Sequence, residues 1–191
     1  VDVGQVYEVD ASRRTTAANA YVTGLGHTKR VVLYDTLLEH FTRDELRLVV
    51  AHELGHVRHD DVPRGLLFIA IVAPFGLLAA AQLTRRLAPA PANGRPGPEI
   101  LPALALSVAI VSALTTTVSN QLSRRVEARA DSFALELARE PDAFISFERR
   151  IALRNLADPD PPGWVTFLTA THPPIADRIG IAEAVRRDGG R

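Results

Sequence analysis

The sequence predicts a mainly helical α+β protein with a small N-terminal β-sheet, a helix carrying an H-E-x-x-H motif, and a two-helix apolar hairpin. Short stretches that alternate apolar and polar residues lie before residue 35, a pattern typical of strands with one buried face. Residues 43–59 follow a helical pattern around the motif. Two later runs of 18 and 19 residues contain no charge, which is the observation that predicts the hairpin.

Composition limits the class of protein. The chain has 191 residues, enough for one domain. Its formal net charge is zero, so we expect no nucleic-acid partner. The absence of cysteine excludes disulfides and thiolate metal ligands. There is no methionine, even at position 1, so we expect an excised piece of a longer protein. Residues 1–10 lack the features of a signal peptide.

Three strands are predicted at residues 6–9, 19–23 and 30–34, and residues 24–28 are expected to join the last two as a hairpin. The next element has a clear start signal. Thr42 and Glu45 form the two ends of a capping box, in which each side chain accepts a hydrogen bond from the other residue's amide. The sequence therefore predicts a helix from about Arg43 to His59.

The motif on this helix is His52-Glu53-Leu54-Gly55-His56. Two histidines four residues apart lie on one face, one turn apart, and could hold a single ion. In zinc hydrolases with this motif the glutamate is the general base. The alternative is a solvated helix face. Apolar neighbours favour the zinc site, because they bury the helix and unpaired buried polar groups are costly.

The two uncharged runs, residues 66–83 and 100–118, have about the length that crosses a bilayer core. We interpret them as a transmembrane hairpin rather than two buried core helices, since a chain this small rarely buries both. The proline- and glycine-rich residues 88–99 form the loop between them. The second helix is expected to continue to about residue 136. Further helices are predicted at 141–155 and 175–187, with a rigid loop at 158–164.

A catalytic zinc ion usually has three protein ligands, so a third must come from elsewhere. His59 is excluded, because it lies seven residues past His52, roughly 10 Å along the helix. The remaining candidates are Glu127, Asp131, Glu136, Glu140 and His172. Glu127 and Asp131 share a helix face at about the level of His56 above the predicted spans. One of the two could bind metal while the other orients a histidine. The alternative is a solvated face paired with neighbouring arginines.

Five blocks of sequence occur in the order of a known family: residues 19–24, 30–38, 51–61 (AHELGHVRHDD), 127–131, and 171–174 followed by Arg178. Through them the chain resembles the Ste24/HtpX type of membrane zinc metallopeptidases, peptidase family M48. Residues 19–24 and 158–174 are closer to Ste24. Ste24-type enzymes carry several spans before the sheet, whereas this chain begins at the sheet, as expected for an excised fragment.

The resemblance implies a zincin-like metalloprotease domain over residues 1–191. Residues 1–62 would form the sheet and motif helix, and residues 119–191 the third-ligand region. It implies that one Zn²⁺ is bound by His52, His56 and Glu127, that Glu53 is the base, and that Asp131 orients a ligand. His172 matches a family histidine that faces the substrate. Asn19 matches a family asparagine on the substrate side. A substrate strand is expected along the sheet edge at Asn19, Ala20 and Tyr21.

The expected function is zinc-dependent hydrolysis of peptide bonds at a membrane surface. The partners would be a peptide or protein substrate and membrane lipid. Two alternatives remain: a zinc hydrolase acting on another bond, or a catalytically inactive membrane scaffold. The intact Glu53 argues against the scaffold, because an inactive site could lose its base. Arginines flank both ends of the spans, so charge does not fix the orientation. The family implies a cytoplasmic site. Whether the substrate is a prenylated or a misfolded membrane protein is left open.

Overall fold

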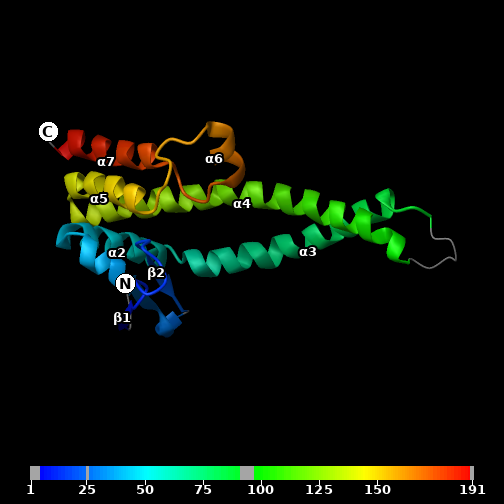
Figure 1. Cartoon of the computed structure of the whole chain (residues 1–191), viewed down its shortest axis with the longest axis horizontal. Coiled ribbons are helices and arrows are strands. Elements are labelled where there is room, and N and C mark those ends of the chain that lie inside the picture. Colours follow the sequence, from blue (N-terminus) through cyan, green and yellow to red (C-terminus); the bar gives the residue numbers. More distant parts are fainter. Residues whose placement is uncertain (1–4, 25, 91–96, 190–191) are drawn as a thin grey trace.

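Two long helices, α3 (Asp61–Leu87) and α4 (Leu101–Ala138), project as a hairpin from a head that contains the other elements, apart from a 3-10 turn before α4 (Figure 1). The computed structural model describes residues 5–24, 26–90 and 97–189. α4 runs from the far end of the hairpin into the head, so it belongs to both parts. This helix therefore links the apolar hairpin directly to the packing of the head.

The head contains a sheet with the order β1-β3-β2. β1 (Gln5–Val9) pairs in parallel with β3 (Arg30–Tyr34), and β2 (Ala20–Thr23) pairs antiparallel with β3. The three predicted strands and the antiparallel pairing of the last two are confirmed. Leu25, within the predicted hairpin turn, lies outside the described residues. Because β3 is central, β2 is an edge strand of the sheet formed by the described residues, and its outer side carries no further strand there.

α2 (Arg43–Arg58) is the motif helix, and it begins as its sequence predicts. The Thr42 side chain accepts a hydrogen bond from the Glu45 amide, and Glu45 accepts one from the Thr42 amide, at 2.7 Å. The Glu45 carboxylate is buried and also binds Arg150 of α5 (Pro141–Arg154) at 2.7 Å. The capping box thus also ties α2 to α5. α2 ends before Asp60, whose left-handed φ of 53° separates it from α3.

α2 packs closely against α4, and the glycine of the motif permits this contact. A Cβ atom on Gly55 would lie 3.2 Å from Cα of Ala130 and 3.3 Å from the Phe133 ring. Both distances are tighter than ordinary packing, so a side chain here would require α4 to shift by a few tenths of an ångström. Because Glu127 lies one turn before Ala130 on α4, this contact also brings Glu127 to the level of the motif.

Two apolar clusters hold the head together. One joins the sheet to α2 and α5 through Val31, Leu33, Leu37, Phe41, Val49 and Phe147, with Ala18 beside them. The other joins α2, α4, α5 and α7 (Ile175–Gly189) through Leu48, Ala51, Ala134, Leu135, Phe144, Ile145 and Ala182. α2 contributes to both clusters on different faces. The motif helix is therefore fixed from two sides, as a precise metal site requires.

The hairpin helices expose their apolar surfaces. In the most apolar 18-residue stretch of α3 only 6% is buried, and in the corresponding stretch of α4 only 11% is buried. Such surfaces are unfavourable in water, which supports a membrane hairpin over two buried core helices. Pro74 lies within α3 without ending it. Pro63 lies in the first turn of α3, and the change of direction between α2 and α3 comes at Asp60.

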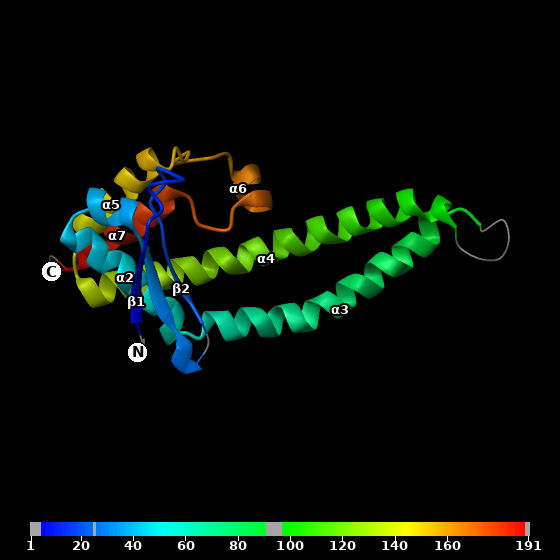
Figure 2. The same cartoon turned by 60° about the horizontal axis from the view of Figure 1, so that its bottom comes forward.

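Two short helices are absent from the sequence prediction. α1 (Asp35–His40) follows β3 directly. α6 (Gly163–Thr169) begins inside residues 158–164, so the prediction of a rigid loop there was wrong over its last two residues. Both helices are too short for a period of 3.6 residues to be distinguished from a loop. α6 lies along α4, close to the point where the hairpin leaves the head (Figure 2).

Candidate metal centre

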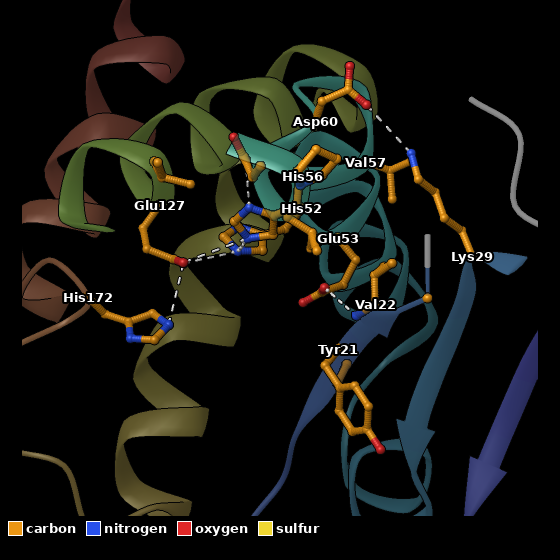
Figure 3. Close-up of a pocket in the computed structure, with 16 residues that line it drawn as sticks. Tyr21, Val22, Lys29, His52, Glu53, His56, Val57, Asp60, Glu127 and His172 are labelled. Carbon is orange, nitrogen blue, oxygen red and sulfur yellow. Dashed lines mark hydrogen bonds and ion pairs between the residues drawn. The ribbon is translucent and has the colours of Figure 1, made fainter. Parts of the chain in front are cut away.

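Three side chains from two helices converge at the crossing of α2 and α4 (Figure 3). The Nε2 atoms of His52 and His56 are 3.1 Å apart. Glu127 Oε2 lies 3.3 Å from His52 Nε2, and its Oε1 lies 3.7 Å from His56 Nε2. Ligand atoms at the usual zinc distances in a tetrahedral site are separated by about 3.4 Å. The spacing of these atoms therefore fits one metal ion.

The opposite nitrogens of both imidazoles are held by carboxylates. His52 Nδ1 lies 2.9 Å from Asp131 Oδ1, and His56 Nδ1 lies 3.0 Å from Asp61 Oδ2. An ionised carboxylate only accepts hydrogen bonds, so each Nδ1 carries the proton. The Nε2 lone pairs then point towards the same small space. Two such lone pairs at 3.1 Å repel each other unless a proton on one of the nitrogens or a metal ion lies between them, so the pair is arranged to hold a cation.

Asp131 is itself fixed by Arg178 of α7. The guanidinium donates to Asp131 at 2.7 and 2.6 Å and lies 2.9 Å from Glu148 of α5. Asp131 and Glu148 are fully buried. Burial alone would raise the pKa of Asp131, but hydrogen bonds from Arg178 and His52 outweigh it and lower that pKa to about 2. Burial raises the pKa of Glu148 to about 7 despite the positive charge of Arg178.

His56 has an equivalent support that the sequence analysis did not identify. Asp61, in the first turn of α3, accepts from His56 with one oxygen and pairs with Arg129 of α4 through the other. Asp61 lies within a block used for the family resemblance, but no spacing rule assigned it a role. Its contact depends on the turn at Asp60, which the sequence does not signal. The base of the hairpin therefore contacts a candidate ligand.

The electrostatics of the site favour positive charge between the carboxylates. Burial would lower the pKa of His52, but hydrogen bonds with Asp131 and Glu127 outweigh burial and raise that pKa to about 9. The same carboxylates would stabilise a bound cation. Burial raises the pKa of Glu53, with His52 and His56 opposing it. A raised pKa brings a carboxylate closer to the range in which it exchanges protons at neutral pH.

A cleft of about 360 Å³ opens over the three converging side chains. Glu53 lies in its wall and accepts a hydrogen bond from the Val22 amide of β2 at 3.0 Å (Figure 3). His172 enters from the opposite side, with Nε2 3.4 Å from Glu127 Oε2. Ala20 and Tyr21 also line the cleft. The side chains of α2, α4 and β2 therefore meet His172 in a single opening.

Asn19 lies slightly apart from this opening. It lines an adjacent pocket of about 140 Å³. Its side-chain oxygen accepts a hydrogen bond from the Ala20 amide at 2.9 Å, so it stabilises the start of β2. The excluded His59 instead hydrogen-bonds the Gly55 carbonyl at 2.8 Å. The candidates Glu136 and Glu140 are exposed and are not in the converging group.

Comparison with protein-family models matches residues 2–186 to Peptidase family M48. This chain belongs to peptidase family M48. The family resemblance stated from the sequence is therefore confirmed, and with it the zincin-like fold class. Within this M48 chain, the group of His52, His56 and Glu127 is a candidate site for a metal ion.

Curated relatives of this M48 chain are named as proteases. It is 34% identical over 188 residues to the uncharacterized metalloprotease YhfN of Bacillus subtilis, covering 96% of this chain and 44% of the relative. It is 32% identical to a probable CAAX prenyl protease 1 of Schizosaccharomyces pombe, covering 94% and 38%. It is 31% identical to a Bacteroides fragilis protease HtpX homolog, covering 86% and 59%. The chain thus spans 38–59% of the length of these relatives.

A solved structure has the same fold. The crystal structure of S. mikatae Ste24p superposes with a TM-score of 0.78 at 21% identity. The match covers 95% of this chain and 45% of that chain. Two helices of the M48 chain, α3 and α4, are long and apolar enough to cross a membrane and are largely exposed, which favours a membrane location.

Proposed function

We propose that this chain is the catalytic part of a zinc-dependent metalloendopeptidase that hydrolyses peptide bonds at a membrane surface. The observation that carries the proposal is the convergence of His52, His56 and Glu127, with Glu53 beside them in one open cleft. The donor set of two imidazoles and one carboxylate is the set that catalytic zinc commonly has in metallopeptidases. When bound, zinc supplies a Lewis acid that polarises the scissile carbonyl and acidifies a water.

Glu53 is proposed as the general base. Its carboxylate would take a proton from the attacking water and deliver it to the leaving amine. In the structure Oε2 is held by the Val22 amide at 3.0 Å. A substrate strand added along β2 could offer a carbonyl to this amide instead. Substrate binding would then release Glu53 towards the water. Glu53 would therefore become available as the base only when a substrate occupies the cleft.

The remaining residues would position the reaction. Asp131 would hold His52 in the orientation that leaves Nε2 free. His172 would donate a hydrogen bond from Nε2 to the carbonyl oxygen as negative charge develops there. The substrate backbone would pair with β2 at Ala20 and Tyr21, close to Asn19. This is supported by the edge position of β2 and by the lining of the two neighbouring pockets.

The membrane geometry completes the proposal. The hairpin would span the bilayer, with the cleft just outside it on the cytoplasmic side. A substrate that is itself membrane-associated, such as a prenylated or a misfolded membrane protein, would reach the cleft along the surface. The S. pombe relative is named for cleavage of CAAX prenyl proteins, and the B. fragilis relative is named as an HtpX-type protease. Both substrate classes are therefore worth testing.

The test is metal analysis of the purified chain beside cleavage of casein and of a prenylated CAAX peptide. Bound zinc with cleavage that Glu53→Gln abolishes supports the proposal. Bound zinc without cleavage of casein or of the CAAX peptide would contradict the peptidase and leave the two alternatives, a hydrolase for another bond and an inactive scaffold. Failure of the wild-type chain to retain zinc after dialysis would overturn the proposed site.

A further inference from the structure

The short helix α6 exposes three large apolar side chains in one stripe. Trp164, Phe167 and Leu168 are 70%, 52% and 46% exposed. They lie at positions i, i+3 and i+4, so they share one face of the helix. Residues 163–171 contain no charged side chain. A stripe of this kind in water is unfavourable and marks a surface that contacts another phase or molecule.

The place of α6 relative to the hairpin indicates which phase it contacts. Side chains of α4 bind its last carbonyls: Asn120 donates to Leu168 O at 2.9 Å, and Gln121 donates to Phe167 O at 2.8 Å. These donors lie two and three residues after residue 118, where the apolar run ends. At 1.5 Å per residue they are only about 3–5 Å beyond it. The interfacial layer on each side of a bilayer is about 5–7 Å thick.

The position of α6 in the fold agrees with a place next to the end of the apolar run. In both whole-chain views α6 is the element of the head that lies furthest along the hairpin (Figures 1 and 2). Arg124 of α4 donates to Thr166 O at 2.9 Å and also to Ala170 O. The polar backbone at the end of α6 is thus satisfied by protein groups. This is what a helix near hydrocarbon requires, because lipid tails offer no hydrogen-bond partners.

We propose that α6 is an interfacial membrane anchor, with Trp164, Phe167 and Leu168 inserted at the boundary between lipid headgroups and acyl chains. Tryptophan favours this layer because its ring is apolar while its indole N–H can bond to headgroups or water. The surface is continuous with the lipid-facing hairpin, so one bilayer would cover both. His172 follows α6 by only three residues. The anchor would therefore also fix the height of His172 above the membrane.

Trp164 is the only tryptophan in the chain, so its fluorescence reports on α6 alone. The 191-residue chain is reconstituted into phosphatidylcholine vesicles that carry a spin label either near the headgroup or near the end of the acyl chain. We expect the shallow label to quench Trp164 more strongly than the deep one. Acrylamide in the water should quench it several-fold less than it quenches a fully hydrated tryptophan, because an interfacial ring is partly shielded from water.

Two matched reporters on α4 calibrate the depth, each in a Trp164→Phe background. Leu137→Trp replaces an exposed side chain about 28 Å beyond the apolar run and should respond to acrylamide only. Ile110→Trp replaces an exposed side chain about 12 Å inside the run and should respond best to the deep label. If neither lipid label quenches the tryptophan of Ile110→Trp, the hairpin does not span the bilayer, and the proposed anchor is refuted as well.

Trp164 itself has three outcomes that would overturn the anchor while Ile110→Trp behaves as expected. Acrylamide quenching equal to that of Leu137→Trp would place α6 in water. Protection from acrylamide and from both lipid labels would mean that protein covers it, either another segment or a second copy. Stronger quenching by the deep label would mean that α6 inserts into the hydrocarbon. None of these outcomes depends on zinc or on peptidase activity, so the proposed function is tested separately.

Discussion

Glu127 and Asp131 lie one turn apart on α4 and both contact His52, and we propose different roles for them. Glu127→Ala should abolish metal binding, since it removes one of three ligands. Asp131→Asn should weaken binding by about 10–100-fold, or roughly 1.4–2.7 kcal/mol, as expected for loss of a carboxylate that orients a ligand histidine. We expect the upper end, because Asp131 is fully buried and binds His52 and Arg178 at 2.6–2.9 Å.

The assay is competition for zinc with a chromophoric chelator of known affinity. Asp142→Asn is a matched control, since Asp142 pairs with Arg186 at 3.0 Å but both are exposed and remote from the cleft. It should leave zinc affinity unchanged. If Glu127→Ala retains zinc while Asp131→Asn loses it completely, the two roles are exchanged. If Asp131→Asn matches wild type, the orienting role is wrong.

The same variant tests the linkage between protonation and folding. The pKa of Asp131 is lowered from 3.8 to about 2, so its charged form stabilises the folded state. That contribution, about 2 kcal/mol, is present above pH 4 and is lost as the pH falls through 2. In metal-free protein the stability difference between wild type and Asp131→Asn should therefore shrink between pH 4 and pH 2. A difference that is constant over this range, measured by urea unfolding, would contradict the reasoning.

Four further substitutions test other parts of the site. Glu53→Gln should retain zinc and lose peptide hydrolysis, measured by metal analysis beside a casein assay. His172→Ala should lower kcat about 10²–10³-fold with little change in KM on a quenched peptide, whereas a change within a few-fold would leave His172 structural. Asp61→Asn should weaken zinc binding about 10-fold in the chelator assay, and unchanged affinity would remove its role. Gly55→Ala should destabilise by about 1–3 kcal/mol in thermal unfolding, and an unchanged or higher stability would refute the close packing of α2 on α4.

Local signals in the sequence determined much of the fold. The capping box at Thr42 and Glu45, the alternation in the strands and the length of the two apolar runs each depend on residues close together in the chain. The same holds for His52 and His56, because the period of the helix alone places them on one face. For the third ligand, the rise of the helix excluded His59, and the level above the predicted spans favoured Glu127 and Asp131 without deciding between them. The family resemblance then singled out Glu127.

Only the tertiary structure joined residues from separate elements into the supports of the site. Glu148 lies in a charged stretch of α5 that resembles a solvated face, yet it is fully buried against Arg178. Asp61 reaches His56 because the chain turns at Asp60, and its other partner, Arg129, comes from α4. α6 acquires its position from polar side chains of α4. These contacts depend on how helices pack, and spacing along one element carries no information about the distance between two.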